Sequence, residues 1–158
     1  MACPVLQIKE TRTKGARMVE TPDELSGIQV AIVEHYAPLR ESLALFLRVK
    51  GYRVEAFGSS EEAGDARKLG GFGIVISAFL LPGEDGVSLL RRVREASKTV
   101  ITVLVTAPGN MDFPEETRRA GIDACIVKPF PTEELEGVLL RLTGKGRGGS
   151  RAVLEAVT

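Results

Sequence analysis

Short runs of aliphatic residues alternate along the chain with segments in which apolar residues recur every three or four positions. The runs predict β-strands at residues 28–33, 52–57, 74–76, 100–105 and 124–127. Four of them are almost uninterrupted in Val, Ile, Leu and Ala, which is typical of strands buried on both faces of a parallel sheet. The run at 52–57 alternates apolar with polar residues and predicts an edge strand that is wetted on one side.

Apolar residues at helical spacing follow each predicted strand. The first predicted helix begins at Pro38 and stops at Gly51, and the second begins at the capping box Ser59–Glu62 and fades at Gly70. Three more helices are predicted from residue 87 onwards, over 114–120 and over 135–142. Five strands that alternate with five helices predict a doubly wound α/β parallel sheet with right-handed crossovers.

The pattern divides the chain into three parts. Residues 1–27 are charged and are interrupted by Gly and Pro, so we predict an N-terminal extension. Within it, a hairpin that pairs 5–9 with 16–20 and a mobile arm are both open alternatives. Residues 28–142 form the predicted domain, and residues 143–158 begin with a Gly-rich run that predicts a flexible C-terminal tail.

The composition of the chain indicates which kinds of binding partner and which cellular location to expect. Lys and Arg together number 21, as do Asp and Glu, so no overall electric field steers the chain toward nucleic acid or an anionic membrane. The basic residues after Glu136 are interpreted as a solvated linker, and we do not expect nucleic acid as a partner. Cys3 and Cys125 are too few for a disulfide framework, which predicts a reducing, cytoplasmic location. No apolar run is long enough for a membrane span.

Polar chemistry is expected where the predicted strands end, because ligands of open α/β sheets bind at the carboxyl ends of the strands. Glu34 and His35 follow the first strand, Thr106 ends the fourth and Lys128 follows the fifth. The third strand, however, leads into Ala78. A methyl group cannot act as a nucleophile, a base or a metal ligand. The central position of this predicted site therefore has no side chain that could react or bind a metal.

The motifs at these strand ends resemble those of the receiver domain of bacterial two-component response regulators, over about residues 28–142. They are Leu-Pro-Gly-Glu-Asp-Gly at 81–86, Thr-Ala at 106–107 and Lys-Pro-Phe at 128–130. The resemblance implies a flavodoxin-like (βα)5 sheet in strand order 2-1-3-4-5. It also implies a cis peptide bond between Lys128 and Pro129.

The same resemblance assigns roles to individual positions. In the family, an aspartate after strand three accepts a phosphoryl group, and an acidic pair after strand one helps it to hold magnesium. These positions are Ala78, Glu34 and His35 here, whereas the phosphate-contacting hydroxyl and ammonium groups are retained as Thr106 and Lys128. We therefore interpret these residues as a vestigial phosphorylation pocket. Magnesium binding is expected to be lost, because magnesium prefers several hard oxygen ligands, and no other cofactor is expected.

A further departure from the family lies on the fifth strand. Cys125 occupies the switch position, where the family usually has an aromatic ring that turns inward when the threonine engages phosphate. Neither Ser77, which should point to the other side of its strand, nor Asp85, which should cap the next helix, is expected to replace the acceptor. Cys125 itself is interpreted as a small core residue and His35 as a polar loop residue, with a reactive thiol and a soft-metal ligand as the alternatives.

These expectations predict a pseudo-receiver: a phosphorylation-independent protein interaction module in bacterial signalling, without enzymatic activity. The resemblance implies a partner protein on the face made by helix four, strand five and helix five of the family. We also expect Glu34 and Lys128 to form an ion pair in the empty pocket. Two alternatives remain open: a conventional receiver with an engineered Asp-to-Ala change at 78, and a pseudo-receiver that senses a small molecule. A homodimer is likewise left open.

Overall fold

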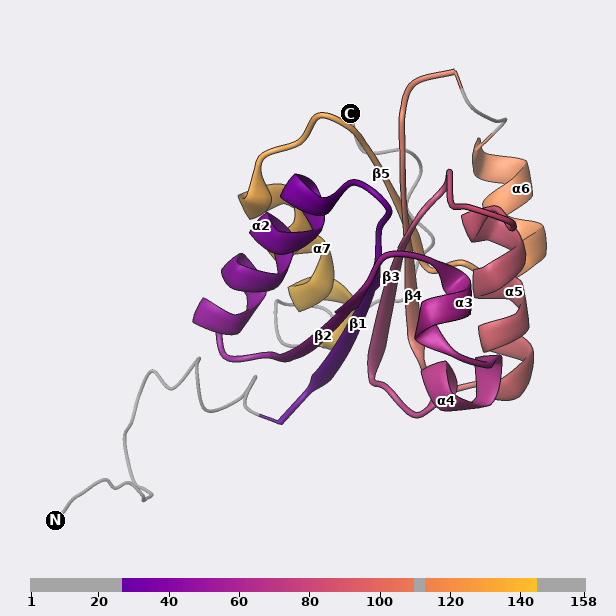
Figure 1. Ribbon diagram of the computed structural model, residues 1–158, viewed down its shortest axis with the longest axis horizontal. Helices are drawn as coiled ribbons and strands as arrows, with labels where there is room; N and C mark the ends of the chain where they lie inside the picture. Colours follow the sequence, from indigo (N-terminus) through magenta and orange to yellow (C-terminus); the bar gives the residue numbers. More distant parts are fainter. Residues whose placement is uncertain (1–26, 110–112, 145–158) are drawn as a thin grey trace, which may run out of the picture.

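The computed structural model describes residues 27–109 and 113–144, which build a five-stranded parallel sheet (Figure 1). The strands are β1 (Gln29–Val33), β2 (Arg53–Phe57), β3 (Ile74–Ala78), β4 (Ile101–Thr106) and β5 (Ala124–Val127). They lie in the order β2-β1-β3-β4-β5. The predicted doubly wound sheet and its strand order are confirmed. The bounds of β5 agree with the prediction, and those of β1 to β4 differ from it by one or two residues, because an aliphatic run does not mark where backbone pairing stops.

Helices cover both faces of the sheet (Figure 1). They are α2 (Ala37–Val49), α3 (Ser60–Ala63), α4 (Ala66–Gly70), α5 (Gly86–Ala96), α6 (Phe113–Ala120) and α7 (Thr132–Thr143). α2 and α7 pack on one face and share a core with Ile74 and Ile76 of β3. α3, α4 and α5 pack on the opposite face, where the core includes Val75. Alternate side chains of β3 thus enter two separate apolar layers, as predicted for a strand buried on both faces.

The predicted second helix is wrong as a single helix, because the chain forms α3 and α4 instead. Ser59 caps α3, since its Oγ accepts the backbone N–H of Glu62 at 3.0 Å, and this part of the prediction is confirmed. Gly64 then adopts φ +96° and ψ −163°, a conformation that favours glycine and ends the helix. Asp65 caps α4 by accepting the N–H of Lys68 at 2.9 Å. The capping box marked the beginning of the helix but not this interruption.

The edge strand β2 and the end of α7 were also predicted from the sequence. Val54 of β2 is buried between the exposed Arg53 and Glu55, which confirms the predicted alternation. α7 extends to Thr143, one residue into the predicted tail, and Gly144 caps it in a left-handed conformation. The predicted hairpin at 5–9 and 16–20 and the rest of the tail, 145–158, lie outside the described residues.

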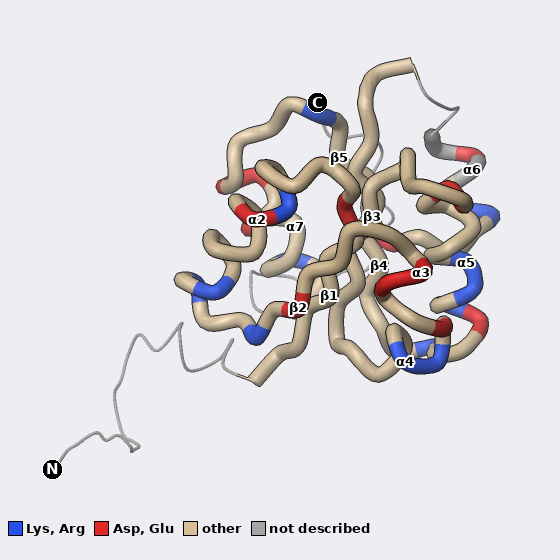
Figure 2. Tube along the Cα trace, in the orientation of Figure 1, with Lys and Arg blue, Asp and Glu red and all other residues tan. Residues whose placement is uncertain are grey.

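Charged residues of both signs are spread over the helices on both faces of the sheet (Figure 2). In the part of the chain that the structure describes, no helix has the length and apolar character needed to cross a membrane.

Candidate functional site

Strand pairing brings the predicted site residues to one edge of the sheet. Val33 of β1 lies beside Ser77 of β3, and Ala78 lies beside Val105 of β4. Thr106 in turn lies beside Val127 of β5. Each of these paired positions is, or is directly followed by, a residue that the sequence analysis singled out at a strand end. The register thus gathers Glu34, Ala78, Thr106 and Lys128 at the carboxyl edge.

Glu34 and Lys128 form an ion pair at this edge. Glu34 is buried, with 4% of its surface exposed, and its Oε1 lies 3.3 Å from the Nζ of Lys128. The other carboxylate oxygen accepts the backbone N–H of Tyr36 at 2.9 Å. The backbone N–H of Lys128 also donates to the carbonyl of Thr106 at 2.6 Å. The predicted ion pair is therefore confirmed, and it balances the charge of the buried carboxylate.

Arg40 holds the loop between β1 and α2, a role that the sequence analysis missed. Its guanidinium donates to the carbonyl oxygens of Glu34 at 2.8 Å and of His35 at 3.3 Å. His35 itself is exposed. The spacing of Arg40 from Glu34 carried no signal of this contact, because the contact depends on how the loop turns back over the first turn of α2.

Ala78 ends β3 in a tightly enclosed position, with 3% of its surface exposed. The backbone N–H of Gly86 donates to the carbonyl of Phe79 at 2.7 Å. A Cβ at Gly86 would lie 2.0 Å from the Ala78 carbonyl oxygen, so only Gly fits there. The loop after β3 is thus closed directly over the residue that occupies the centre of the site.

Ser77 and Asp85, two polar residues close to Ala78 in sequence, are both engaged in local hydrogen bonds. The Ser77 hydroxyl donates to the Ala78 carbonyl at 2.9 Å, and its strand position alternates with Ala78. Asp85 caps α5, since its carboxylate accepts the backbone N–H of Ser88 at 2.8 Å. The predicted capping role of Asp85 is confirmed.

Two further predicted residues are buried side chains, Thr106 at the end of β4 and Cys125 within β5. Thr106 is 1% exposed, and its hydroxyl lies 3.4 Å from the Ala107 carbonyl. Cys125 is a free thiol, also 1% exposed, in the apolar layer that contains Leu104. Burial raises the pKa of Cys125 to about 12, so the thiol is protonated at neutral pH. The peptide bond between Lys128 and Pro129 is cis, as the resemblance implied.

The side chains at the site offer few ligands for a hard cation. Glu34 is the acidic residue that directly follows β1, and Lys128 already balances its charge. Ala78 contributes a methyl group and the neighbouring His35 an imidazole. Within residues 27–109 and 113–144, no group of three or more His, Cys, Asp and Glu side chains is arranged to hold a metal ion. This donor set does not fit the several oxygen ligands that magnesium prefers.

Comparison with known sequences supports one family. The family model described as the response regulator receiver domain matches residues 30–139. The two-component response regulator PhoP of Pseudomonas aeruginosa is 33% identical over 129 residues, which cover 82% of this chain and 57% of PhoP. The transcriptional regulatory protein ResD of Bacillus subtilis is 27% identical over 129 residues, which cover 82% of this chain and 52% of ResD. The chain spans about half the length of these curated relatives.

Solved structures support the same fold. The chemotaxis response regulator CheY4 of Vibrio cholerae superposes with a TM-score of 0.64 at 25% identity, covering 72% of this chain and 97% of CheY4. A CheY-like receiver domain protein of Methanospirillum hungatei superposes with a TM-score of 0.65 at 23% identity, covering 74% and 94% of the two chains. The second likeness concerns the fold alone.

Proposed function

The chain belongs to the response regulator receiver domain family, and from that membership we propose that it is a phosphorylation-independent pseudo-receiver. In this proposal, the domain works by binding another signalling protein and not by accepting a phosphoryl group. The membership itself rests on the family match over residues 30–139 and on the sheet topology. The phosphorylation-independent mechanism rests on the side chains at the carboxyl edge of the sheet.

The observation that carries the proposal is the identity of the residue at the end of β3. Ala78 lies at the carboxyl end of the central strand, next to β4 and ahead of the loop closed by Gly86. The acyl phosphate of a receiver requires a carboxylate at this position, and an alanine methyl cannot form one. Ser77 and Asp85 are already engaged in local bonds, which argues against a substitute acceptor beside it.

The charge balance at the site supports the same proposal. A receiver that takes up phosphate needs a divalent cation and an ammonium group that is available to the phosphoryl oxygens. Here Lys128 pairs with Glu34 at 3.3 Å, so binding an anion at Lys128 would compete with an existing contact to a buried carboxylate. We propose that the pocket holds neither magnesium nor a phosphoryl group and that the ion pair is structural.

The position of Cys125 extends the proposal to the switch mechanism. The thiol is buried on β5 and is far smaller than an aromatic ring. A small side chain packed in an apolar layer has no alternative rotamer that would carry a large group into or out of the site. We therefore propose that the domain presents one constant surface to its partner. We further propose that it has no enzymatic activity and acts in the cytoplasm.

The proposed docking surface for the partner protein consists of α6, β5 and α7, which correspond to the usual output face of the family. β5 is one of the two edge strands of the sheet, so its outer side is not covered by another strand. The two helices carry exposed residues of both signs, including Arg118 on α6 and Glu133 and Arg141 on α7. Such a mixed surface suits a partner protein with complementary charges. A homodimer through this surface is the alternative occupant.

A phosphorylation assay tests the proposal most directly. The chain is incubated with acetyl phosphate and magnesium, and its intact mass is measured without acid treatment, with PhoP of Pseudomonas aeruginosa as the positive control. We expect no gain of a phosphoryl group under conditions that modify the control. A labile phosphoryl group on the unchanged chain would overturn the proposal.

The proposed docking surface has a separate test. Binding of interaction partners from the native cell is compared between the unchanged chain, Arg118→Glu on the proposed surface and Arg67→Glu on α4, which is not part of the proposed surface. We expect Arg118→Glu to lose the partner and Arg67→Glu to retain it. Equal binding by both variants would contradict the assignment of the surface.

A further inference from the structure

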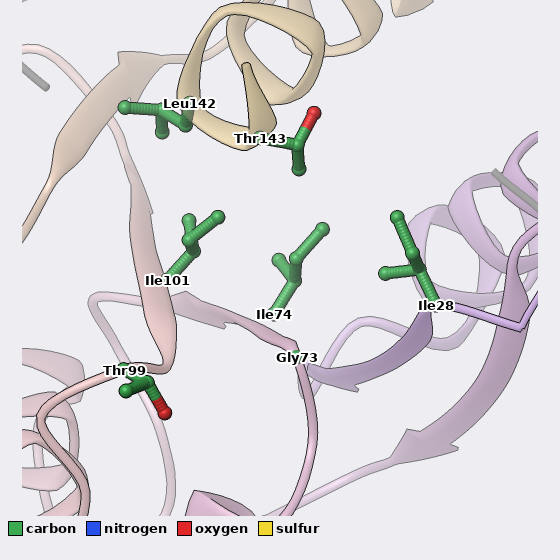
Figure 3. Close-up of a pocket in the computed structure, with 7 residues that line it drawn as sticks. All are labelled: Ile28, Gly73, Ile74, Thr99, Ile101, Leu142 and Thr143. Carbon is green, nitrogen blue, oxygen red and sulfur yellow. The ribbon is translucent and has the colours of Figure 1, made fainter. Parts of the chain in front are cut away.

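A hollow lies at the amino ends of the strands, at the edge of the sheet opposite the candidate site (Figure 3). Its volume is about 410 Å³, and it is lined by Ile28, Gly73, Ile74, Thr99, Ile101, Leu142 and Thr143. Ile74 opens β3, Ile101 opens β4, and Leu142 and Thr143 end α7. The lining is therefore mostly aliphatic and comes from segments that are far apart in the sequence.

The hollow is the open end of the apolar layer between the sheet and the helices α2 and α7. Ile74 and Leu142 belong to the buried cluster of that layer, and Ile28 and Ile101 pack against it while remaining partly exposed. In Figure 3 the three isoleucine side chains extend from the sheet toward the end of α7. Covering this end would remove further aliphatic surface from water, which is favourable.

Both ends of the described domain lie at the rim of this hollow. Ile28 and Thr143 line it, and each is adjacent to a glycine in the left-handed conformation, Gly27 with φ +94° and Gly144 with φ +82°. Apart from the glycine itself and its chain neighbours, no atom of the described residues lies within 4 Å of the position that a Cβ would take at either glycine. The chain beyond α7 therefore starts beside the hollow, with open space around its first residue.

We infer that the segment 151–158 of this same chain docks in the hollow and closes the apolar layer. Five of its eight residues are apolar, namely Ala152, Val153, Leu154, Ala156 and Val157. The six residues 145–150 separate it from Gly144 and can span at most about 20 Å. That length is sufficient for the segment to fold back across the end of α7 onto the amino ends of the strands.

The composition of the two chain ends favours this segment over the one that precedes Ile28. Residues 20–26 contain a single large apolar residue, Leu25, and three carboxylates that would lose hydration in an apolar hollow. The segment 151–158 carries one carboxylate, Glu155. Lys98 and Arg141, the exposed neighbours of the lining residues Thr99 and Leu142, supply positive charge beside the hollow for it.

Methyl NMR of the full chain tests this docking. We compare the unchanged chain with Leu154→Glu, which places a carboxylate in the apolar segment, and with the matched control Ser150→Glu, which adds the same group in the Gly-rich run. We expect Leu154→Glu to shift the δ1-methyl signals of Ile28, Ile74 and Ile101. The signal of Ile122, which belongs to the apolar layer on the opposite face of the sheet, should stay unchanged. Ser150→Glu should leave all four signals in place.

Three outcomes would overturn the inference. The first is identical signals for Ile28, Ile74 and Ile101 in the unchanged chain and in Leu154→Glu. The second is a shift of these signals by Leu25→Glu but not by Leu154→Glu, which would assign the hollow to the N-terminal segment. The third is a dependence of the signals on protein concentration, which would assign it to a second copy of the chain. An unchanged Ile122 signal shows that Leu154→Glu is folded, so loss of folding does not confuse the comparison.

Discussion

The Nζ of Lys128 lies 3.3 Å from the Oε1 of Glu34, and this contact joins the residue after β5 to the residue after β1. The glutamate side chain is 5% exposed and the lysine side chain 33% exposed. Removing the lysine would leave a buried carboxylate with the backbone N–H of Tyr36 as its remaining described donor. The pair therefore stabilises the carboxyl edge of the sheet by avoiding an uncompensated charge.

Lys128→Met should lower the free energy of unfolding by about 2 kcal/mol, because it leaves the Glu34 carboxylate buried and unpaired. The loss should be smaller when Glu34→Gln is present in the same chain, since the charge that needs compensation is then absent. Urea denaturation of the two single variants and the double variant measures this coupling. Arg67→Met, at an exposed position, is the control. Strictly additive losses would show that the pair contributes nothing.

Ala78→Asp alone should not restore phosphorylation by acetyl phosphate, because His35 still replaces the second acidic ligand for magnesium. The double variant Ala78→Asp with His35→Asp should take up a phosphoryl group that depends on magnesium. Intact-mass measurement with and without a chelator distinguishes these cases. Efficient phosphorylation of Ala78→Asp alone would favour the alternative in which an otherwise conventional receiver carries an isolated change at position 78.

Gly86→Ala should destabilise the domain by about 3 kcal/mol or more, since its Cβ would lie 2.0 Å from the carbonyl oxygen of Ala78, and backbone cannot move aside cheaply. The opposite sign is expected for Gly137→Ala in α7, where the nearest atom to the new Cβ is Nη1 of Arg141 at 3.7 Å. Higher helix propensity should then stabilise the domain by about 0.5–1 kcal/mol. Thermal unfolding of both variants measures these two changes in stability. A stable Gly86→Ala variant would contradict the geometry of the loop after β3.

Asp123 is expected to be a major contributor to stability away from the site. Its Oδ2 accepts Nη2 of Arg94 at 2.6 Å and the backbone N–H of Thr102 at 2.9 Å, and Asp123 is 6% exposed. Asp123→Ala should cost about 3 kcal/mol, because it leaves the guanidinium and the buried N–H without this acceptor.

The matched control for Asp123 is Glu115→Ala, which breaks an exposed pair with Arg119 within α6. This change should cost less than about 0.5 kcal/mol. Chemical denaturation compares the two variants under the same buffer conditions. Similar losses in both would show that burial does not distinguish the two ion pairs.

Stability should decline as the pH rises from about 9 to 12. Burial raises the pKa of Cys125 from 9.0 to about 12, and burial together with Glu136 raises the pKa of Tyr52 from 10.0 to about 12. The unfolded chain releases these protons at lower pH than the folded chain, so alkali favours unfolding. The stabilising contribution is fully present below pH 9 and is lost as the pH approaches 12.

Cys125→Ala and Tyr52→Phe should each flatten this decline, as measured by denaturation at a series of pH values. Tyr52→Phe should preserve stability at neutral pH, because the buried hydroxyl of Tyr52 has no hydrogen-bond partner among the described residues. Tyr36→Phe, at a position that is 62% exposed, is the control and should leave the pH profile unchanged. An unchanged slope in Cys125→Ala would show that the Cys125 thiol does not contribute to the loss of stability at alkaline pH.

Local pattern was sufficient to predict the sheet but not every helix. The aliphatic run around Val75 predicts a strand buried on both faces wherever it lies in the fold, because each neighbouring side chain must find an apolar layer. Gly64 is different, since the break between α3 and α4 requires a residue with positive φ at a point where the helical pattern continues. Arg40 likewise has an ordinary helical spacing, and its bonds to two loop carbonyls appear only when the loop is folded.

By itself, the sequence determined the alternation of strands and helices, the motifs at the strand ends and the alanine at position 78, because these are properties of single positions and short periods. The tertiary structure gave the expected ion pair of Glu34 and Lys128 its 3.3 Å geometry, and it alone decided that Ile28, Ile101 and Leu142 surround a hollow at the opposite edge. These relationships depend on the register of parallel strands that are joined through long crossovers. Residues far apart in the chain become neighbours only when the whole sheet has formed.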